Sequence, residues 1–297
     1  MLYQATHTTR YLYEAPVSHC QSEVRLTPRS LPWQTVFEST IRTTPAPVSF
    51  DERRDYFGNA VSAFAIVEAH DRFETVATSL VRVEANPVAP NRAATWEDAR
   101  ARLADHHQAA DLEAVEFVFD SPFVAAGAEL ADYAHPSFTP GRPLVEAVRD
   151  LSHRIHAEFR YAPKATTIDT PLLETLRQRR GVCQDFSHVL IGALRSMRLA
   201  ARYVSGYLRS GANYQGAEAS HAWVSVYVPD SGWMDIDPTN DVTPGTGHVT
   251  VAWGRDYGDV TPVKGVALGG GRQTVEVDVR VVPVDETALG SARAGGL

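Results

Sequence analysis

The sequence predicts an α+β fold in two parts: a β-sandwich-like N-terminal domain, and a second domain in which helices precede an antiparallel sheet. Three observations indicate this. The chain has 297 residues, more than the roughly 100–200 residues of one domain. Residues 1–88 alternate apolar and polar side chains, as strands do. After Pro143 the apolar spacing becomes three and four, as in helices, and after Leu199 it returns to two.

Residues 1–88 are expected to form the sandwich. Four short runs have strand composition, at 3–13, 36–43, 60–67 and 80–84. Turn residues such as Ala15-Pro16 and Gly58-Asn59 separate these runs. Several short strands separated by turns are typical of an antiparallel sandwich. From its position, we expect this domain to cover one side of a cleft in the domain that follows.

Residues 89–137 are expected to be a linker with short helical elements. A charged, alanine-rich stretch at 96–107 and a second stretch near 124–133 have helical composition. At the other end, residues 285–297 are small, polar and glycine-containing, and we expect a flexible tail there.

The second domain is expected over residues 138–284. Pro143 suits the first turn of a helix that continues to residue 159. A second helix is expected at 171–180, where Gly181 stops it, and a third helix begins near Cys183. Five strands of one antiparallel sheet are then expected, at 201–208, 221–228, 233–237, 249–253 and 274–282.

Composition limits the class of function. Lys and Arg number 28 against 36 Asp and Glu, a net charge of −8. A nucleic-acid-binding protein needs a basic excess, so no nucleic-acid partner is expected. The sequence contains no run of about 18 apolar residues, so it predicts no membrane span. Residues 1–14 lack the apolar stretch of a signal peptide. We therefore expect no membrane partner and a cytoplasmic location.

The chain has two cysteines, Cys20 and Cys183, which are too few for a disulfide framework or a four-cysteine zinc site. Cys183 falls where a helix is expected to begin. The partial positive charge and free N–H groups of a helix N-terminus favour a thiolate and can hold an oxyanion. The alternative is that Cys183 is a small buried hydrophobic residue. A base within reach decides between the two, and we expect Cys20 to be inert.

A candidate base opens the run HAWVSVYV, where alternation puts His221 on the same face as Trp223 and opposite the valines. The next expected strand offers Asp235 and Asp237 on one face, and spacing alone does not choose between them. Taken singly, His221 is as well explained as a structural histidine, and the two acids as solvated turn residues.

The pairing register of these two strands decides whether His221 can meet Asp237. A four-residue loop would pair Val224 with Asp237 and turn the acid towards the valine face. A five-residue loop, residues 228–232, pairs Trp223 with Asp237 and makes His221 a diagonal neighbour, roughly 7–8 Å away between α-carbons. We predict the second register.

Three segments resemble the core of the transglutaminase-like superfamily, in the same order: Gly181–His188 (GVCQDFSH), His221–Val224 (HAWV) and Gly232–Thr239 (GWMDIDPT). The resemblance implies a papain-like α+β core. It implies Cys183 as the nucleophile, His221 as the base and Asp237 as the orienting acid, since Asp237 matches the Asp of Asp-Pro-Thr.

Most of the rest of the chain is similar to bacterial members of this family, which are cysteine proteases or transglutaminases, and the resemblance is weakest over residues 89–137. His7–Tyr13, Arg25–Arg29 and Asp55–Asn59 resemble the β-rich region that precedes their transglutaminase-like domain. Gly254–Pro262 resembles a segment that follows the core.

Further site residues are inferred around this core. Family enzymes place an aromatic N–H or O–H donor beside the cysteine to hold the oxyanion, and Tyr161 is our candidate; a tyrosine that packs under the helix is the alternative. Trp223, Asp185, Arg255 and Tyr257 are candidates for the substrate cleft. Asp185 equally suits a role at the helix dipole, and Arg255 an ion pair in a loop. No calcium loop occurs, and we expect no metal and no cofactor.

Two functions are weighed. The first is thiol-dependent acyl transfer at an amide through a thioester, on a protein or peptide substrate with an amide or glutamine side chain. Water as acceptor makes the enzyme a peptidase or amidase, and an amine makes it a transglutaminase; we favour water slightly. The alternative is a non-catalytic protein-binding scaffold on the same fold. The sequence predicts no oligomeric state.

Overall fold

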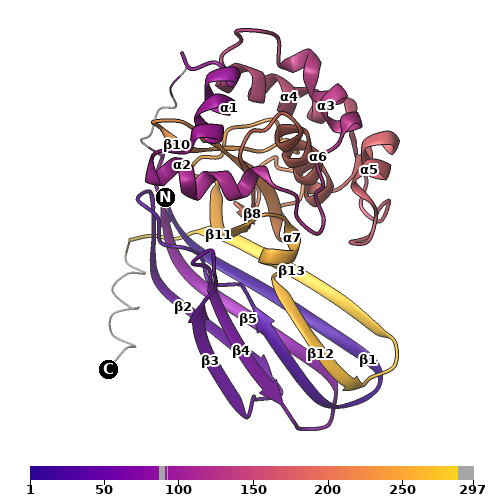
Figure 1. Ribbon diagram of the computed structural model, residues 1–297. Coiled ribbons are helices and arrows are strands. Elements are labelled where there is room, and N and C mark those ends of the chain that lie inside the picture. The colour runs from indigo at the N-terminus through magenta and orange to yellow at the C-terminus, as the bar shows by residue number, and fades with distance from the viewer. Residues whose placement is uncertain (87–90, 92, 287–297) are drawn as a thin grey trace.

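The computed structural model describes residues 1–86, 91 and 93–286 (Figure 1). The last two residues of the expected N-terminal domain, the start of the expected linker at 89, 90 and 92, and the expected tail beyond Glu286 lie outside these residues. A strand-rich part fills the lower half of Figure 1, and helices gather around a second sheet above it. The α+β prediction with a β-rich N-terminal part is confirmed.

The lower part is a seven-stranded antiparallel sheet. Its strands are β1 (Leu2–Val24), β2 (Gln34–Thr44), β3 (Ser49–Arg54), β4 (Ala60–Ile66), β5 (His70–Val83), β12 (Val263–Gly269) and β13 (Gln273–Pro283). β1 is central, and its register shifts between Leu12 and Val17. The first half of β1 pairs with β5 and β13, and its second half with β4 and β12.

The bend in β1 gives the sheet its sandwich-like form. The link between β4 and β5 and the link between β12 and β13 fall at the same level as this bend. Phe64 on β4 and Phe73 on β5 meet at 5.9 Å between ring centroids, inside a cluster that also holds Val24 and Leu26. One continuous sheet therefore folds over a small core of its own, with its corners at the bends.

β13 corrects one prediction. The strand expected at 274–282 forms, but it pairs with β1 from Tyr3↔Pro283 to Tyr13↔Gln273. It therefore belongs to the N-terminal sheet, and its assignment to the second sheet is wrong. The alternation of apolar and polar residues shows which side chains share a face of a strand, but it does not show which strand is the pairing partner. The partner here, β1, lies at the opposite end of the chain.

The helical part begins with α1 (Trp96–Asp105), for which Thr95 provides the N-cap. The next elements are α2 (Ala109–Val115), η1 (Glu116–Val118), α3 (Ala128–Ala134), η2 (His135–Ser137), α4 (Leu144–Glu158), α5 (Leu172–Gln178) and α6 (Cys183–Ser196). α4 and α5 each start directly after a proline, as expected, and α6 starts at Cys183. Among the described helices, none is both long and apolar enough to cross a membrane.

The second sheet has the order β10-β9-β8-β11. Its strands are β8 (Ala201–Leu208), β9 (His221–Val228), β10 (Gly232–Ile236) and β11 (His248–Gly254), and the short helix α7 (Tyr257–Val260) follows. α6 packs on β8 and β9 and buries a stripe of apolar side chains that includes Phe186, Val189 and Leu190. β9 and β10 pair Ile236 with Val224, which is the predicted register.

The two sheets share one core. Tyr3, Ala5 and Val281 from the first sheet lie in the same buried cluster as Tyr207 and Val249 from the second sheet. The N-terminal sheet is thus packed directly against the part of the molecule that holds Cys183.

Candidate active site

Cys183 is the first residue of α6 and is 8% exposed. Asp185 holds this helix start, because its Oδ2 accepts a hydrogen bond of 2.7 Å from the backbone N–H of Val182 and another of 2.7 Å from the Thr166 hydroxyl. Gly181 makes room for that carboxylate, since a Cβ there would lie 2.5 Å from Oδ2. Asp185 therefore positions Cys183 by holding the backbone at the start of α6. It does not line the cavity beside Cys183.

His221 and Asp237 meet as the register predicts. His221 opens β9, and Asp237 follows the last residue of β10. His221 Nε2 lies 2.8 Å from Asp237 Oδ2, and neither side chain is exposed. Asp235, the alternative acid, is two residues further from His221 along the ladder, opposite Ser225.

Asp237 is held by further groups that the sequence analysis did not identify. Its Oδ1 accepts the backbone N–H groups of Thr239 (2.9 Å) and Asn240 (3.2 Å). Its Oδ2 accepts the Asn240 side-chain amide at 2.8 Å and faces Nε2 of His248, on β11, at 3.4 Å. These contacts fix both carboxylate oxygens, including Oδ2, which also faces His221.

The charges of the pair stabilise each other. Burial lowers the pKa of His221, but the charges of Asp237 and Cys183 outweigh it and raise that pKa to about 10. Burial raises the pKa of Asp237, but the charge of His221 and the hydrogen bonds of His221, His248 and Asn240 bring it well below its usual range. The site therefore favours an imidazolium beside a carboxylate.

The second ring nitrogen of His221, Nδ1, does not contact Asp237. Nδ1 has no hydrogen-bond partner among the described residues. A Cβ on Gly216, whose φ is +84°, would lie 3.0 Å from this nitrogen and 3.3 Å from Tyr161 Oη. Cys183, Tyr161 and Gly216 line one cavity of about 1080 Å³. The phenol and the thiol thus line one cavity, and the imidazole lies next to Gly216 in the wall of that cavity.

Tyr161 reaches this space through a short parallel pairing. β6 (Arg160–Tyr161) pairs with β7 (Arg180–Gly181), so that Tyr161 lies beside Gly181, two residues before the cysteine. Burial, followed by the charges of Cys183 and Asp237, raises the pKa of Tyr161 to about 12. The hydroxyl therefore stays protonated and can donate a hydrogen bond.

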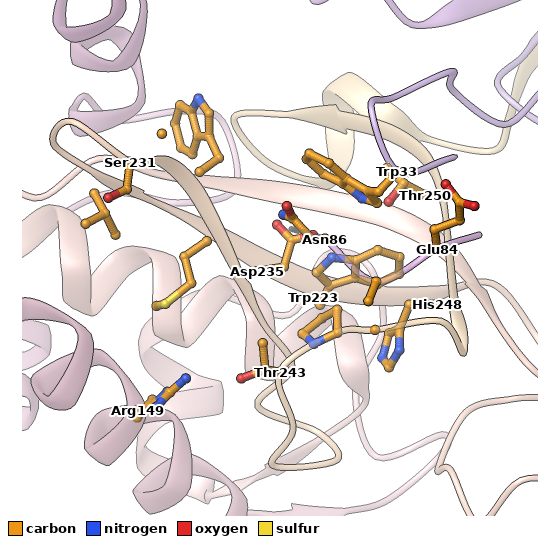
Figure 2. Close-up of a pocket in the computed structure, with 17 residues that line it drawn as sticks. Trp33, Glu84, Asn86, Arg149, Trp223, Ser231, Asp235, Thr243, His248 and Thr250 are labelled. Atoms are coloured by element: carbon orange, nitrogen blue, oxygen red, sulfur yellow. The ribbon is translucent and has the colours of Figure 1, made fainter. Parts of the chain in front are cut away.

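The other predicted cleft residues do not line this cavity. Trp223 is fully buried and borders a separate cavity of about 190 Å³; Figure 2 shows it between Asp235 and His248. Arg255 forms an ion pair with Asp259 at 2.9 Å, which was its alternative.

Tyr257, the last of these candidates, packs against the shared core. Its backbone N–H donates to Nε2 of His188 at 3.2 Å. Cys20 is buried as a free thiol in the N-terminal sheet. Among the residues that the structure describes, no group of three or more His, Cys, Asp or Glu side chains could hold a metal ion.

Two family models match this chain. Residues 3–82 match the bacterial transglutaminase-like N-terminal region. Residues 132–238 match the transglutaminase-like superfamily, and this range contains Cys183, His221 and Asp237.

Relatives and a solved structure agree with these matches. An uncharacterized protein of Mycobacterium tuberculosis is 36% identical over 97% of this chain and 94% of its own length, and one of Mycobacterium leprae is 34% identical over 94% and 97%. A protein-glutamine gamma-glutamyltransferase of Pseudomonas aeruginosa is 32% identical over 39% of this chain and 18% of its own. The crystal structure of a candidate cysteine protease from Cytophaga hutchinsonii superposes with a TM-score of 0.73, at 19% identity, over 96% of this chain and 92% of that one.

Proposed function

This chain belongs to the transglutaminase-like superfamily, and from that membership we propose that it catalyses cysteine-dependent acyl transfer at an amide. Cys183 is the nucleophile, His221 the general acid and base, and Asp237 the group that orients His221. One observation carries the proposal. The buried His221–Asp237 pair, 2.8 Å apart, leaves Nδ1 of His221 unpaired beside the cavity that Cys183 lines.

The reaction begins with attack of the Cys183 thiolate on the amide carbon. A C–S bond forms, and the carbonyl π pair moves to oxygen, where Tyr161 Oη and the first N–H groups of α6 can stabilise the negative charge. When the oxyanion collapses, the C–N bond breaks, and Nδ1 of His221 gives its proton to the departing nitrogen. The products are a thioester and a free amine or ammonia.

A second nucleophile resolves the thioester. Neutral His221 removes a proton from water or from an amine, which attacks the carbonyl carbon while the thiolate of Cys183 leaves. Water gives a carboxylic acid, and an amine gives a new amide. We propose a protein or peptide substrate with an amide or glutamine side chain, and water as the preferred acceptor.

The choice of acceptor is tested by ammonia release from benzyloxycarbonyl-Gln-Gly, with and without methylamine. Hydrolysis predicts equal ammonia release in both cases and benzyloxycarbonyl-Glu-Gly as the product. If release requires methylamine, the enzyme is a transglutaminase and the preference for water is wrong. Cys183→Ala should abolish release under both conditions.

Thiol reactivity separates an enzyme from a non-catalytic scaffold. At pH 6 we expect iodoacetamide to label Cys183 faster than free cysteine, because the His221 imidazolium stabilises the thiolate. His221→Ala should remove this advantage. If the wild-type thiol reacts no faster than free cysteine, and the Cys183→Ala chain is as active as the wild type, the acyl-transfer proposal fails.

A further inference from the structure

β13 presents one edge that no described strand covers. Its inner edge pairs with β1 along the whole strand. On its outer edge, Val281 donates its N–H to the Ser210 hydroxyl at 2.9 Å and accepts the Ser210 N–H at 3.0 Å. Val279 donates its N–H to the carbonyl of Glu218 at 3.1 Å. The odd-numbered residues of β13 therefore direct their backbone groups outwards.

This row of backbone groups continues past the last partner. Val277 and Val275 follow Val279 with the same orientation, because backbone direction repeats every second residue. Neither has a strand partner on this side among the described residues. Their side chains lie on the same face as Val279, yet they are 43% and 47% exposed, whereas Val279 is 3% exposed.

The open edge leads into the cavity of Cys183. Val277 and Val279 line that cavity together with Cys183 and Tyr161. Edge strands usually avoid further pairing through proline, charged side chains or a bulge. The run from Gln273 to Arg280 has no proline, its charged residues Glu276, Asp278 and Arg280 stand at even positions, on the face opposite the valines, and its pairing with β1 is regular.

We propose that the acyl-donor substrate binds as an extended peptide segment that pairs with the outer edge of β13 at Val275 and Val277. Such strand addition draws affinity from main-chain hydrogen bonds and selectivity from alternate side chains. The segment would place apolar residues over the two valines and lead its reactive glutamine along the cavity wall to Cys183. This inference rests on the proposed function and adds the conformation of its substrate.

A proline on the edge tests the pairing. Val277→Pro removes an outward N–H that the β1 ladder does not use, so the sheet can retain its hydrogen bonds. Two donors are compared: dimethylcasein, which can extend along β13, and benzyloxycarbonyl-Gln-Gly, which is too short. We expect kcat/KM for dimethylcasein to fall about tenfold more than kcat/KM for the short donor, as the loss of one or two such bonds implies. Val277→Ile, which keeps the N–H, should preserve the ratio of the two donors.

A second experiment leaves the protein sequence of the edge intact. A nine-residue peptide that alternates valine and lysine around a central glutamine is methylated on one or the other alternate set of backbone nitrogens. Strand pairing predicts that one set abolishes its turnover by the wild-type enzyme and the other does not. Equal effects of the two sets, or equal losses of both donors with Val277→Pro, would overturn the proposal.

Binding without turnover separates this inference from the proposed function. In Cys183→Ala, the unmethylated peptide should protect the amides of Val275 and Val277 from hydrogen exchange at least tenfold. If the peptide protects these amides in Cys183→Ala, but the wild-type protein turns over neither donor, the catalytic proposal is contradicted and peptide binding at the β13 edge is supported. Turnover of the short donor without any protection would contradict the edge alone.

Discussion

Asp237 shows how much of a site a sequence can specify at the scale of single residues. Its contact with His221 follows from one register, which the length of the turn between β9 and β10 determines. Asn240 and His248 were not predicted. Asn240 lies three residues beyond Asp237, where a side-chain amide can reach back, and this local signal was available. His248 could not be found in this way, because its contact depends on where β11 lies in the sheet.

The His221–Asp237 pair predicts a pH dependence of stability. An unfolded histidine has a pKa near 6.5, and the folded His221 has one of about 10. The charged histidine therefore contributes its full stabilisation below pH 6.5 and loses it progressively as the pH rises through about 10. We expect the gap in unfolding free energy between wild type and His221→Gln, measured by urea denaturation, to shrink over this range.

His153 provides a control for this measurement. It also pairs with an acid, Asp241, at 2.7 Å, but its side chain is 65% exposed. An exposed pair contributes little to stability, so His153→Gln should change the unfolding free energy only slightly at any pH. A gap for His221→Gln that stays constant from pH 6 to pH 10 would show that the charge of His221 does not stabilise the fold.

Tyr161 predicts a loss that is confined to the chemical step. Tyr161→Phe removes the hydroxyl proposed to hold the oxyanion and leaves the ring in place. We expect kcat for benzyloxycarbonyl-Gln-Gly to fall on the order of 10²-fold with little change in KM. Tyr257→Phe is the matched control, since Tyr257 does not line the cavity. Equal kcat values for the two variants would exclude Tyr161 from this role.

At the scale of elements, the helix starts were the most predictable features. α4 and α5 follow prolines and α6 follows a glycine and a valine, so local chemistry marks where each helix begins. The sequence predicted less well which sheet each strand joins. β13 has the alternation of any strand, and only the packing of Val279 and Val281 into the shared core reveals its place.

The start of α6 is sensitive to a single methyl group. In Gly181→Ala the new Cβ would overlap Oδ2 of Asp185 and disturb the hydrogen bonds that hold Cys183. We expect a loss of about 1–3 kcal/mol in unfolding free energy and slower labelling of Cys183 by iodoacetamide. In Gly245→Ala the new Cβ meets no atom within 4 Å, and stability should stay within about 0.5 kcal/mol. Equal effects of both substitutions would contradict this account.

At the scale of the whole molecule, the N-terminal sheet and the part that holds Cys183 form one packed unit. Its strand β13 lines the cavity of Cys183, and its buried face completes the shared core. No described residue of the predicted N-terminal domain, residues 1–88, lines that cavity, and the sheet contributes to the cavity wall only through β13. The expectation that this domain covers one side of the cleft therefore stays a prediction. Sequence spacing could not show that a strand from the far end of the chain provides this wall.

Removal of residues 1–85 should accordingly prevent folding. The deletion takes away β1, the partner of both β12 and β13, and exposes core residues such as Tyr207 and Val249. We expect an insoluble chain, or one without a cooperative thermal transition, whereas a chain that ends at Glu286 keeps every described element. A soluble fragment with cooperative unfolding and wild-type labelling of Cys183 would disprove this dependence.

Because β1 pairs with β13, the N-terminal sheet cannot be completed until late in protein synthesis. β1 leaves the ribosome first, and β13 is among the last described elements to follow. While the chain is still being translated, the thiol of Cys183 and its partners have already emerged, but one wall of their cavity is missing. If a substrate pairs with β13 as proposed, a nascent chain cannot hold one there, and the binding surface is complete only when translation is nearly finished.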